Sequence, residues 1–82
     1  MCYVYILKSL SHPDQMYMGC TKDLKKRLSN HNAGTTPHTS KFKPWKLVMY
    51  LAFDDEKRAF EFEKYLKSHS GRSFAAKRFY EV

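Results

Sequence analysis

Two short apolar runs separated by a polar turn open the chain. The first is predicted to be a strand over Cys2 to Lys8, and every residue between its ends is apolar or aromatic. One face would carry Tyr3, Tyr5 and Leu7, and the other Val4 and Ile6. Since both faces are apolar, a central strand covered on both sides is predicted.

The second strand is predicted at Met16 to Cys20, after a hairpin loop over Ser9 to Gln15. Gly19, near its end, predicts a bulge or a close backbone approach.

A helical period follows at once, and it predicts a helix that ends at about Asn32. Its inward positions, spaced i, i+3, i+4 and i+7, are Leu24, Arg27, Leu28 and His31. Either Thr21 or Asp23 can cap its start. An arginine and a histidine therefore lie one turn apart on or beside the face that packs on the hairpin. Charged residues are seldom placed there without a partner.

The second half of the chain predicts a third strand and two further helices. A polar, basic loop from Thr35 to Pro44 is expected to be mobile; it either contacts a backbone phosphate or serves as an ordinary connector. A strand follows over Trp45 to Phe53, in which Trp45 is expected to pack in the core or at its rim. The next helix would begin with three acids, which suit its dipole, and end near Ser68. Ser70-Gly71 would break it, leaving a short last helix over 73–79.

Glu63 is the one carboxylate past the first turn of the longer helix that could reach inward. The apolar stripe of that helix contains Ala59, Phe62 and Leu66, and Glu63 lies at its edge. The alternative is an exposed boundary residue that pairs with Lys67 at i+4. Spacing alone leaves both open.

Charge changes this picture by indicating a partner. The chain of 82 residues carries 15 basic and 8 acidic side chains, a net charge of +7, and is expected to form one domain over 1–82. Between Lys22 and Lys46 the only acid is Asp23. Such a field attracts nucleic acid first and an anionic membrane second. The candidate nucleic-acid-binding residues are Lys22, Lys25, Lys26, Lys41 and Lys43.

The remaining composition excludes several classes. Neither Cys2 nor Cys20 has a CxxC partner, and no His/Cys cluster has zinc spacing. No signal peptide or membrane span is recognised, so a reduced, cytoplasmic chain with free thiols and no membrane partner is expected. GxGxxG, P-loop, nucleophile-elbow and HExxH motifs are absent. A Cys20–His31 pair is available, but no spacing supports a thiol nucleophile.

The inward polar groups suit phosphodiester hydrolysis. These groups are Tyr5, Tyr17, Arg27, His31 and Glu63. Arginine binds phosphate oxygens bidentately and keeps its charge. A lone carboxylate suits Mg²⁺, which takes few protein ligands and keeps several waters. A tyrosine can pass a proton, but its pKa of about 10 makes it a poor base unless cations lower that pKa.

In order and spacing these motifs resemble the GIY-YIG endonucleases, above all their small stand-alone bacterial members. The likeness covers nearly the whole chain: Y-V-Y-I-L at 3–7, Y-M-G at 17–19, D-L-K-K-R-L at 23–28, H-N-A-G at 31–34, P-W-K-L-V at 44–48, the A-F-E-F-E-K-Y-L-K-S helix at 59–68 and the S-G-R-S-F-A-A-K-R-F ending. The two tyrosine triplets alone would be a weak signal. Together with the arginine and glutamate helices they are strong.

The resemblance implies an α+β fold, a three-stranded antiparallel sheet flanked by three helices. It also implies residue roles. Tyr5 matches the tyrosine that closes the first triplet, and Tyr17 the one that opens the second. Arg27 matches the catalytic arginine, His31 a histidine that many members carry, and Glu63 the ligand of a single Mg²⁺ or Mn²⁺.

The chain departs from the family pattern at three places. Tyr3 stands where the name-giving glycine would be, as in many small members, and Met18 replaces an isoleucine. The region about a dozen residues after the glutamate, Ser73 to Ala76, lacks the asparagine of many family nucleases.

The sequence thus predicts a magnesium-dependent endonuclease or nickase acting on nucleic acid, DNA first. No attached DNA-binding domain is recognised, so target specificity would come from its own basic face or from a partner protein. The alternatives are a non-catalytic nucleic-acid-binding module and a protein-interaction domain.

Overall fold

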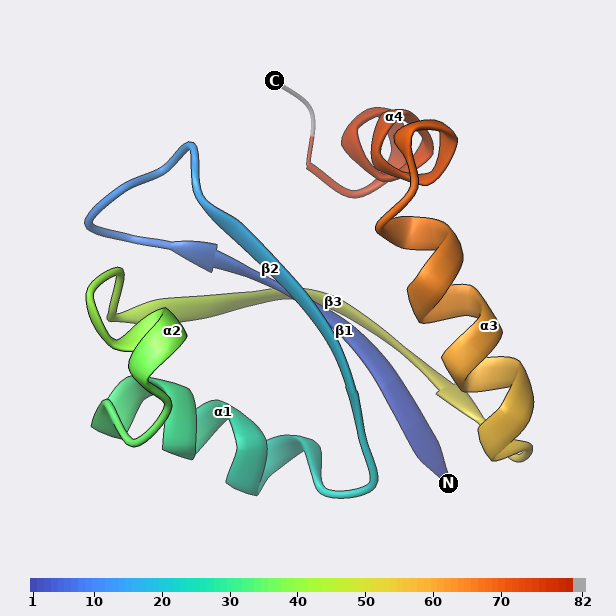
Figure 1. Cartoon of the computed structure of the whole chain (residues 1–82), viewed down its shortest axis with the longest axis horizontal. Coiled ribbons are helices and arrows are strands. Elements are labelled where there is room, and N and C mark those ends of the chain that lie inside the picture. Colours follow the sequence, from blue (N-terminus) through green and yellow to red (C-terminus); the bar gives the residue numbers. More distant parts are fainter. Residues whose placement is uncertain (81–82) are drawn as a thin grey trace.

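The computed structural model of the chain describes residues 1–80 and is built on a three-stranded antiparallel sheet (Figure 1). The strands are β1 (Cys2–Ser9), β2 (Met16–Thr21) and β3 (Trp45–Phe53), in the order β2-β1-β3. The predicted α+β class and the central position of the first strand are confirmed. The last two residues of the predicted 1–82 domain lie outside the described part.

Helices cover both faces of the sheet. Figure 1 shows α1 (Leu24–Ala33) and the short α2 (Pro37–Ser40) on one side, with α3 (Glu56–Leu66) and α4 (His69–Arg78) on the other. Successive side chains of β1 point to opposite faces of the sheet, so they pack into two separate core clusters, one under each pair of helices. Val4 and Ile6 are fully buried against α3 and α4, and Tyr5 and Leu7 are fully buried on the α1 side. Burying a large apolar side chain contributes about 1.5–3 kcal/mol, so the central strand anchors both helical layers.

Both residues that were predicted as possible caps, Thr21 and Asp23, accept hydrogen bonds at the start of α1. The Asp23 carboxylate accepts a hydrogen bond from the Lys26 backbone N–H at 3.0 Å, and the Thr21 hydroxyl accepts one from the Asp23 N–H at 3.1 Å. Two otherwise unpaired donors are therefore satisfied, which fixes where the helix begins.

The segment between residues 35 and 44 differs from the predicted loop, because it contains α2. The chain therefore has four helices among the described residues, and the expected count of three is wrong. Hydrogen bonds attach this segment to the β1–β2 hairpin: the Ser9 hydroxyl donates to the Phe42 carbonyl at 2.6 Å and the Leu10 N–H to the Pro44 carbonyl at 2.9 Å. Trp45 is 4% exposed and packs in the core, as predicted.

The boundary between the last two helices also differs from the prediction. The chain leaves α3 before Ser68, whose hydroxyl caps α4 by accepting from the Gly71 N–H at 3.1 Å. Gly71 thus belongs to the first turn of α4 and is not a breaker. A Cβ there would lie 1.8 Å from the Tyr65 carbonyl oxygen, so only glycine permits this close packing of α4 on α3.

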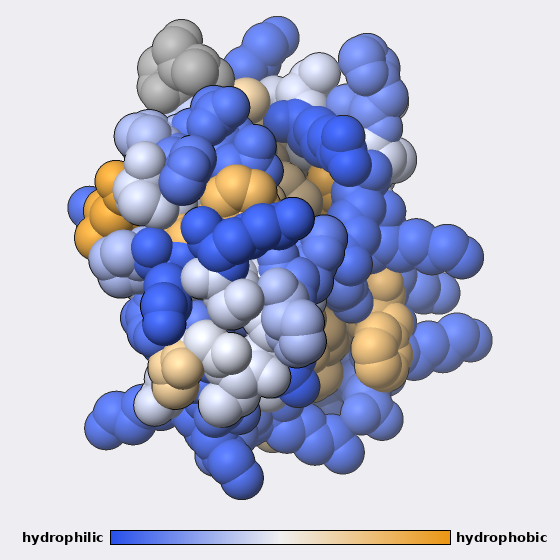
Figure 2. Space-filling model, turned by 60° about the vertical axis from the view of Figure 1, so that its left-hand side comes forward, coloured by the Kyte–Doolittle hydropathy of each residue, from blue (hydrophilic) through white to orange (hydrophobic). Residues whose placement is uncertain are grey.

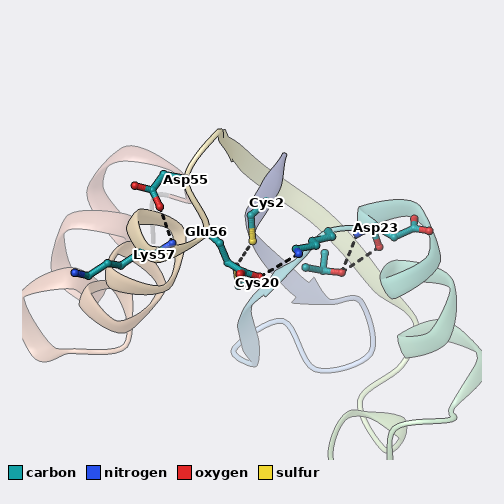
Figure 3. A network of polar contacts seen from close by, with 8 residues as sticks. Cys2, Cys20, Asp23, Asp55, Glu56 and Lys57 are labelled. Carbon is teal, nitrogen blue, oxygen red and sulfur yellow. Dashed lines mark hydrogen bonds and ion pairs between the residues drawn. The ribbon is translucent and has the colours of Figure 1, made fainter.

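The start of α3 is tied to the end of β2 by polar contacts (Figure 3). Asp55 caps the helix by accepting from the Lys57 N–H at 2.9 Å, and Glu56 forms an ion pair with Lys22 at 3.4 Å. Nearby, the sulfur atoms of Cys2 and Cys20 lie 3.0 Å apart as free thiols. Of these contacts, the ion pair of Lys22 with Glu56 joins the residue after β2 to the first turn of α3. Among residues 1–80, no helix combines the length and the apolar character needed to cross a membrane.

Candidate active site

The side chain of Tyr5 crosses the edge strand at Gly19. Tyr5 and Gly19 are register partners in the β1–β2 pair. A Cβ built on Gly19 would lie 2.5 Å from the Tyr5 hydroxyl oxygen and 2.7 Å from the ring carbon that carries it. The close approach predicted at this glycine is therefore confirmed, and the atom that approaches belongs to a tyrosine of the site. Only a glycine leaves room for the ring.

A chain of hydrogen bonds runs from this hydroxyl into α1 and α2. The Tyr5 oxygen lies 3.3 Å from Nε2 of His31, and Nδ1 of His31 lies 2.8 Å from the Thr39 hydroxyl. That hydroxyl in turn donates to the Thr36 carbonyl at 3.4 Å. Since a carbonyl can only accept, the assigned direction is Nδ1–H to Thr39 and the Tyr5 O–H to Nε2. His31 is 1% exposed, and this partner on each ring nitrogen is what permits its burial.

The pKa shifts of Tyr5 and His31 agree with this direction of the hydrogen bonds. Burial raises the pKa of Tyr5 to about 12, and the charges of Tyr17 and Glu63 add to the rise while Arg27 opposes it. Burial lowers the pKa of His31, and the Arg27 charge lowers it further. At neutral pH the phenol is therefore protonated and the imidazole is neutral. The arginine alone does not lower the pKa of Tyr5 below its ordinary value, which the sequence analysis had required of a tyrosine base.

Tyr17 completes the aromatic side of the cluster from β2. Its ring centroid is 4.8 Å from that of His31 and 6.3 Å from that of Tyr5, both in tilted arrangements. Tyr17 is half-buried, whereas Tyr5 is fully buried. Of the two tyrosines, Tyr17 is the one that solvent reaches.

Glu63 lies on α3, on the other side of the sheet from α1 (Figure 1). Its negative charge contributes to the raised pKa of Tyr5 and also to that of Cys20, which rises to about 12 mainly through burial and the neighbouring Cys2 thiol. The carboxylate is also paired with Lys67 at 2.9 Å, and its side chain is 18% exposed. The i+4 pair with Lys67 is therefore present, and the role of Glu63 at the site stays a prediction.

The residues around Glu63 fit a single hard divalent cation. Mg²⁺ commonly takes one or two carboxylates and keeps several waters, so one partly accessible carboxylate is a sufficient protein ligand. Within residues 1–80, no three His, Cys, Asp or Glu side chains gather into a richer metal site. Ala75, about a dozen residues after Glu63, is fully buried in the apolar core and supplies no polar ligand.

The five lysines predicted to bind nucleic acid are all exposed, and they lie around α1 and the segment after it. Lys22 is engaged with Glu56, and the Lys41 ammonium lies 5.7 Å from the centroid of the Phe42 ring. Figure 2 shows that hydrophilic residues cover most of the face it presents, with hydrophobic residues reaching the surface in a few separate areas.

Thr39 is the member of the hydrogen-bond chain that sequence reasoning missed. It lies in a stretch of threonine, serine, proline and lysine that reads as a surface loop. It is nevertheless 1% exposed, because α2 folds it under His31. Its immediate neighbours, His38 and Ser40, are polar, so the sequence pattern at this position does not mark it as buried.

Comparison with known proteins assigns this arrangement to a family. The family model of the GIY-YIG catalytic domain matches residues 1–78, and the chain belongs to that family. Its relatives include UPF0213 proteins of Streptococcus pyogenes serotypes M3 and M1, each 36% identical over 72 residues, which is 87% of this chain and 76% of theirs. The fold is similar to the solution NMR structure of a UPF0213 protein from Bacillus halodurans, with a TM-score of 0.56 and 28% identity, covering 94% of this chain and 84% of that one.

Proposed function

We propose that this protein is a magnesium- or manganese-dependent endonuclease or nickase that hydrolyses phosphodiester bonds in nucleic acid, with DNA as the first substrate to test. The observation that carries the proposal is the hydrogen-bond chain from Tyr5 through His31 to Thr39. The charge of Arg27 acts on the pKa values of both Tyr5 and His31. Membership in the GIY-YIG catalytic-domain family supports the nuclease class.

Tyr5 and His31 would act together as the general base. With a pKa of about 12, the phenol cannot hold a negative charge at neutral pH. Because Tyr5 is fully buried, the attacking water would have to reach its hydroxyl past Gly19 when substrate binds. There the phenol would take a proton from the water as it gives its own to Nε2 of His31, which is neutral and accepts there. The resulting imidazolium keeps its Nδ1–H on Thr39, so the ring does not have to turn during the transfer.

Arg27 and Tyr17 would bind the phosphate. The guanidinium presents a planar set of donors to two non-bridging oxygens and stabilises the charge that grows on them in the transition state. The hydroxyl of Tyr17, which is half-exposed, is available to donate to the same group.

Glu63 would hold the metal ion, which, when bound, supplies charge neutralisation at the phosphate and at the leaving oxygen. Lys67 occupies the carboxylate in the metal-free protein, so it must move aside. Surface pairs contribute about 0.2–1 kcal/mol, and since the Lys67 side chain is half-exposed, a divalent ion could displace it.

The experiment that tests the function uses purified protein with supercoiled plasmid, branched DNA and RNA, in Mg²⁺, Mn²⁺ or EDTA. Nicking or cutting is expected with either metal and not with EDTA. Arg27→Ala and Glu63→Gln should each reduce the rate at least about 100-fold, the scale of losing one transition-state contact. Lys57→Gln, an exposed change on α3 away from the cluster, should cut at the wild-type rate.

One observation favours a non-catalytic nucleic-acid-binding module as a second candidate: the carboxylate is neutralised by Lys67 and no amide ligand follows it on α4. That candidate predicts binding that weakens with salt, and no cleavage under any metal condition. Absence of cleavage by the wild type, or equal cleavage by Arg27→Ala, would refute the nuclease and leave this alternative.

A further inference from the structure

A groove of about 620 Å³ runs along the free edge of β2 and begins at Tyr17 of the cluster. Its walls come from both sides of the sheet, because β2 is an edge strand. The hairpin loop and α2 form one side, and the end of α3, α4 and Tyr80 form the other. Within the described residues, no strand pairs with the outer edge of β2.

The charges of the groove are mostly positive. Among residues 1–80 it is lined by Lys8, Lys67 and Arg72 and by the ring of His38, against one acid, Asp14; Lys67 is also paired with Glu63. None of these was among the lysines that the sequence indicated for nucleic acid, because they come from four separate elements. A cleft lined by one sign of charge concentrates ligands of the opposite sign.

Two tyrosines lie at the groove, Tyr17 and Tyr80. Tyr80 is half-buried against the α3–α4 core. Arg72 lines the same groove as Tyr80. Burial raises the pKa of Tyr80, and the charge of Arg72 partly offsets that rise. Arg72 is exposed and makes no ion pair within residues 1–80. An aromatic face next to an arginine that has no ion-pair partner among residues 1–80 is the arrangement that binds an unstacked base together with its phosphate.

We propose that this groove holds an unpaired nucleotide next to the scissile phosphate, so that the substrate is nucleic acid with a single-stranded segment at the cut. The proposal rests on the proposed function for its ligand class. A groove of roughly this size suits about one nucleotide, as small-molecule pockets do. Bases in an intact duplex present only their edges and cannot enter it. The base would lie against Tyr80, and Arg72 and Lys8 would bind the adjoining phosphates.

Binding is measured apart from cleavage, in EDTA, by fluorescence anisotropy of a labelled 12-nucleotide single strand, the matching duplex and single strands with one abasic position. The single strand should bind at least tenfold more tightly than the duplex. Arg72→Gln should reduce the slope of log affinity against log salt by about 0.7, the value for one phosphate of a single strand. Lys77→Gln, an exposed change on the same helix outside the groove, should leave the slope unchanged.

The stacking is tested with Tyr80→Leu, which keeps apolar volume but removes the ring. It should weaken single-strand binding about five- to 150-fold, the range for one stacked base. The abasic position that most weakens binding to wild type identifies the base that lies against Tyr80. The strand with that abasic position should bind Tyr80→Leu as tightly as it binds wild type. Tyr80→Trp, which keeps an aromatic face, should bind the intact strand at least as well as wild type. This second variant tests the proposal if Tyr80→Leu does not fold.

Equal affinity for duplex and single strand overturns the proposal. So does an Arg72→Gln slope that matches Lys77→Gln, or a loss in Tyr80→Leu that persists on every abasic strand. If the single strand binds as described but no substrate is cut, the proposed nuclease fails while the groove assignment stands. If duplex is cut and the groove variants cut it normally, the nuclease stands and the groove assignment fails.

Discussion

Gly19→Ala tests how tightly the site is built around Tyr5. The new Cβ would lie 2.5 Å from the Tyr5 hydroxyl oxygen, where ordinary contact requires at least 3.4 Å, so the ring must move by about 1 Å. Tyr5 is fully buried and its hydroxyl lies 3.3 Å from His31, so such a shift breaks that hydrogen bond. Overpacking lowers the free energy of unfolding by about 1–3 kcal/mol, and loss of the hydrogen bond lowers it by about 0.5–1.5 kcal/mol. Replacing a glycine raises it by about 0.4–1 kcal/mol, because the unfolded chain becomes less flexible. A net destabilisation of about 1–3 kcal/mol is expected.

Urea and thermal unfolding followed by circular dichroism measure the stability effect. For a domain of this size the midpoint temperature should fall by roughly 5–20 °C. The matched comparison is Gly19→Ala made in a Tyr5→Leu background, where the shorter side chain no longer reaches the new methyl group. There the alanine should be neutral or stabilise by up to about 0.5 kcal/mol. An equal cost in both backgrounds, or no cost in the wild type, would show that Tyr5 does not lie over Gly19.

Two further predictions concern His31 and Lys67. Because the folded protein has a lowered His31 pKa, the unfolded chain binds more protons below about pH 6.5, and the free energy of unfolding should fall as the pH drops from there toward the lowered pKa. Urea unfolding midpoints at pH 7.5 and 5.5 should show this loss of stability. His31→Gln should reduce the pH dependence, and the exposed His12→Gln should leave it unchanged. A pH dependence in His31→Gln equal to that of the wild type would contradict the prediction. Lys67→Met removes the partner of Glu63 and should strengthen Mn²⁺ binding about two- to fivefold, measured by calorimetry without nucleic acid. Affinity equal to the wild type would mean that the pair does not compete with the metal.

The parts of the fold that the sequence predicts are those governed by short-range alternation. The apolar character of both faces of 2–8 identifies a central strand, and the spacing of Leu24, Arg27, Leu28 and His31 identifies α1 and its inward polar pair. α2 and the start of α4 could not be read in this way. Their positions depend on contacts with distant segments, such as Ser9 with Phe42 and the close approach of Gly71 to Tyr65.

The candidate site likewise contains some residues that the sequence predicts and others that it does not. Of the residues that the motifs mark, Tyr5, Tyr17 and His31 lie against one another in the structure. Thr39 and the groove residues Arg72 and Tyr80 carry no local signal, because their environment is made by elements far apart in the chain. The direction of the Tyr5 pKa shift depends on burial, and burial is a property of the packed molecule.

The division of the cluster between the two faces of the sheet has a consequence for synthesis on the ribosome. Tyr5, Tyr17 and Arg27 are all made within the first third of the chain, but β1 cannot be covered on both sides until β3 and α3 have emerged. The carboxylate also arrives with α3. On the proposed function, a nascent chain would have a basic surface that can meet nucleic acid well before it has a complete set of cutting groups. Cleavage of nucleic acid near the translating ribosome would then be postponed until most of the domain has been made.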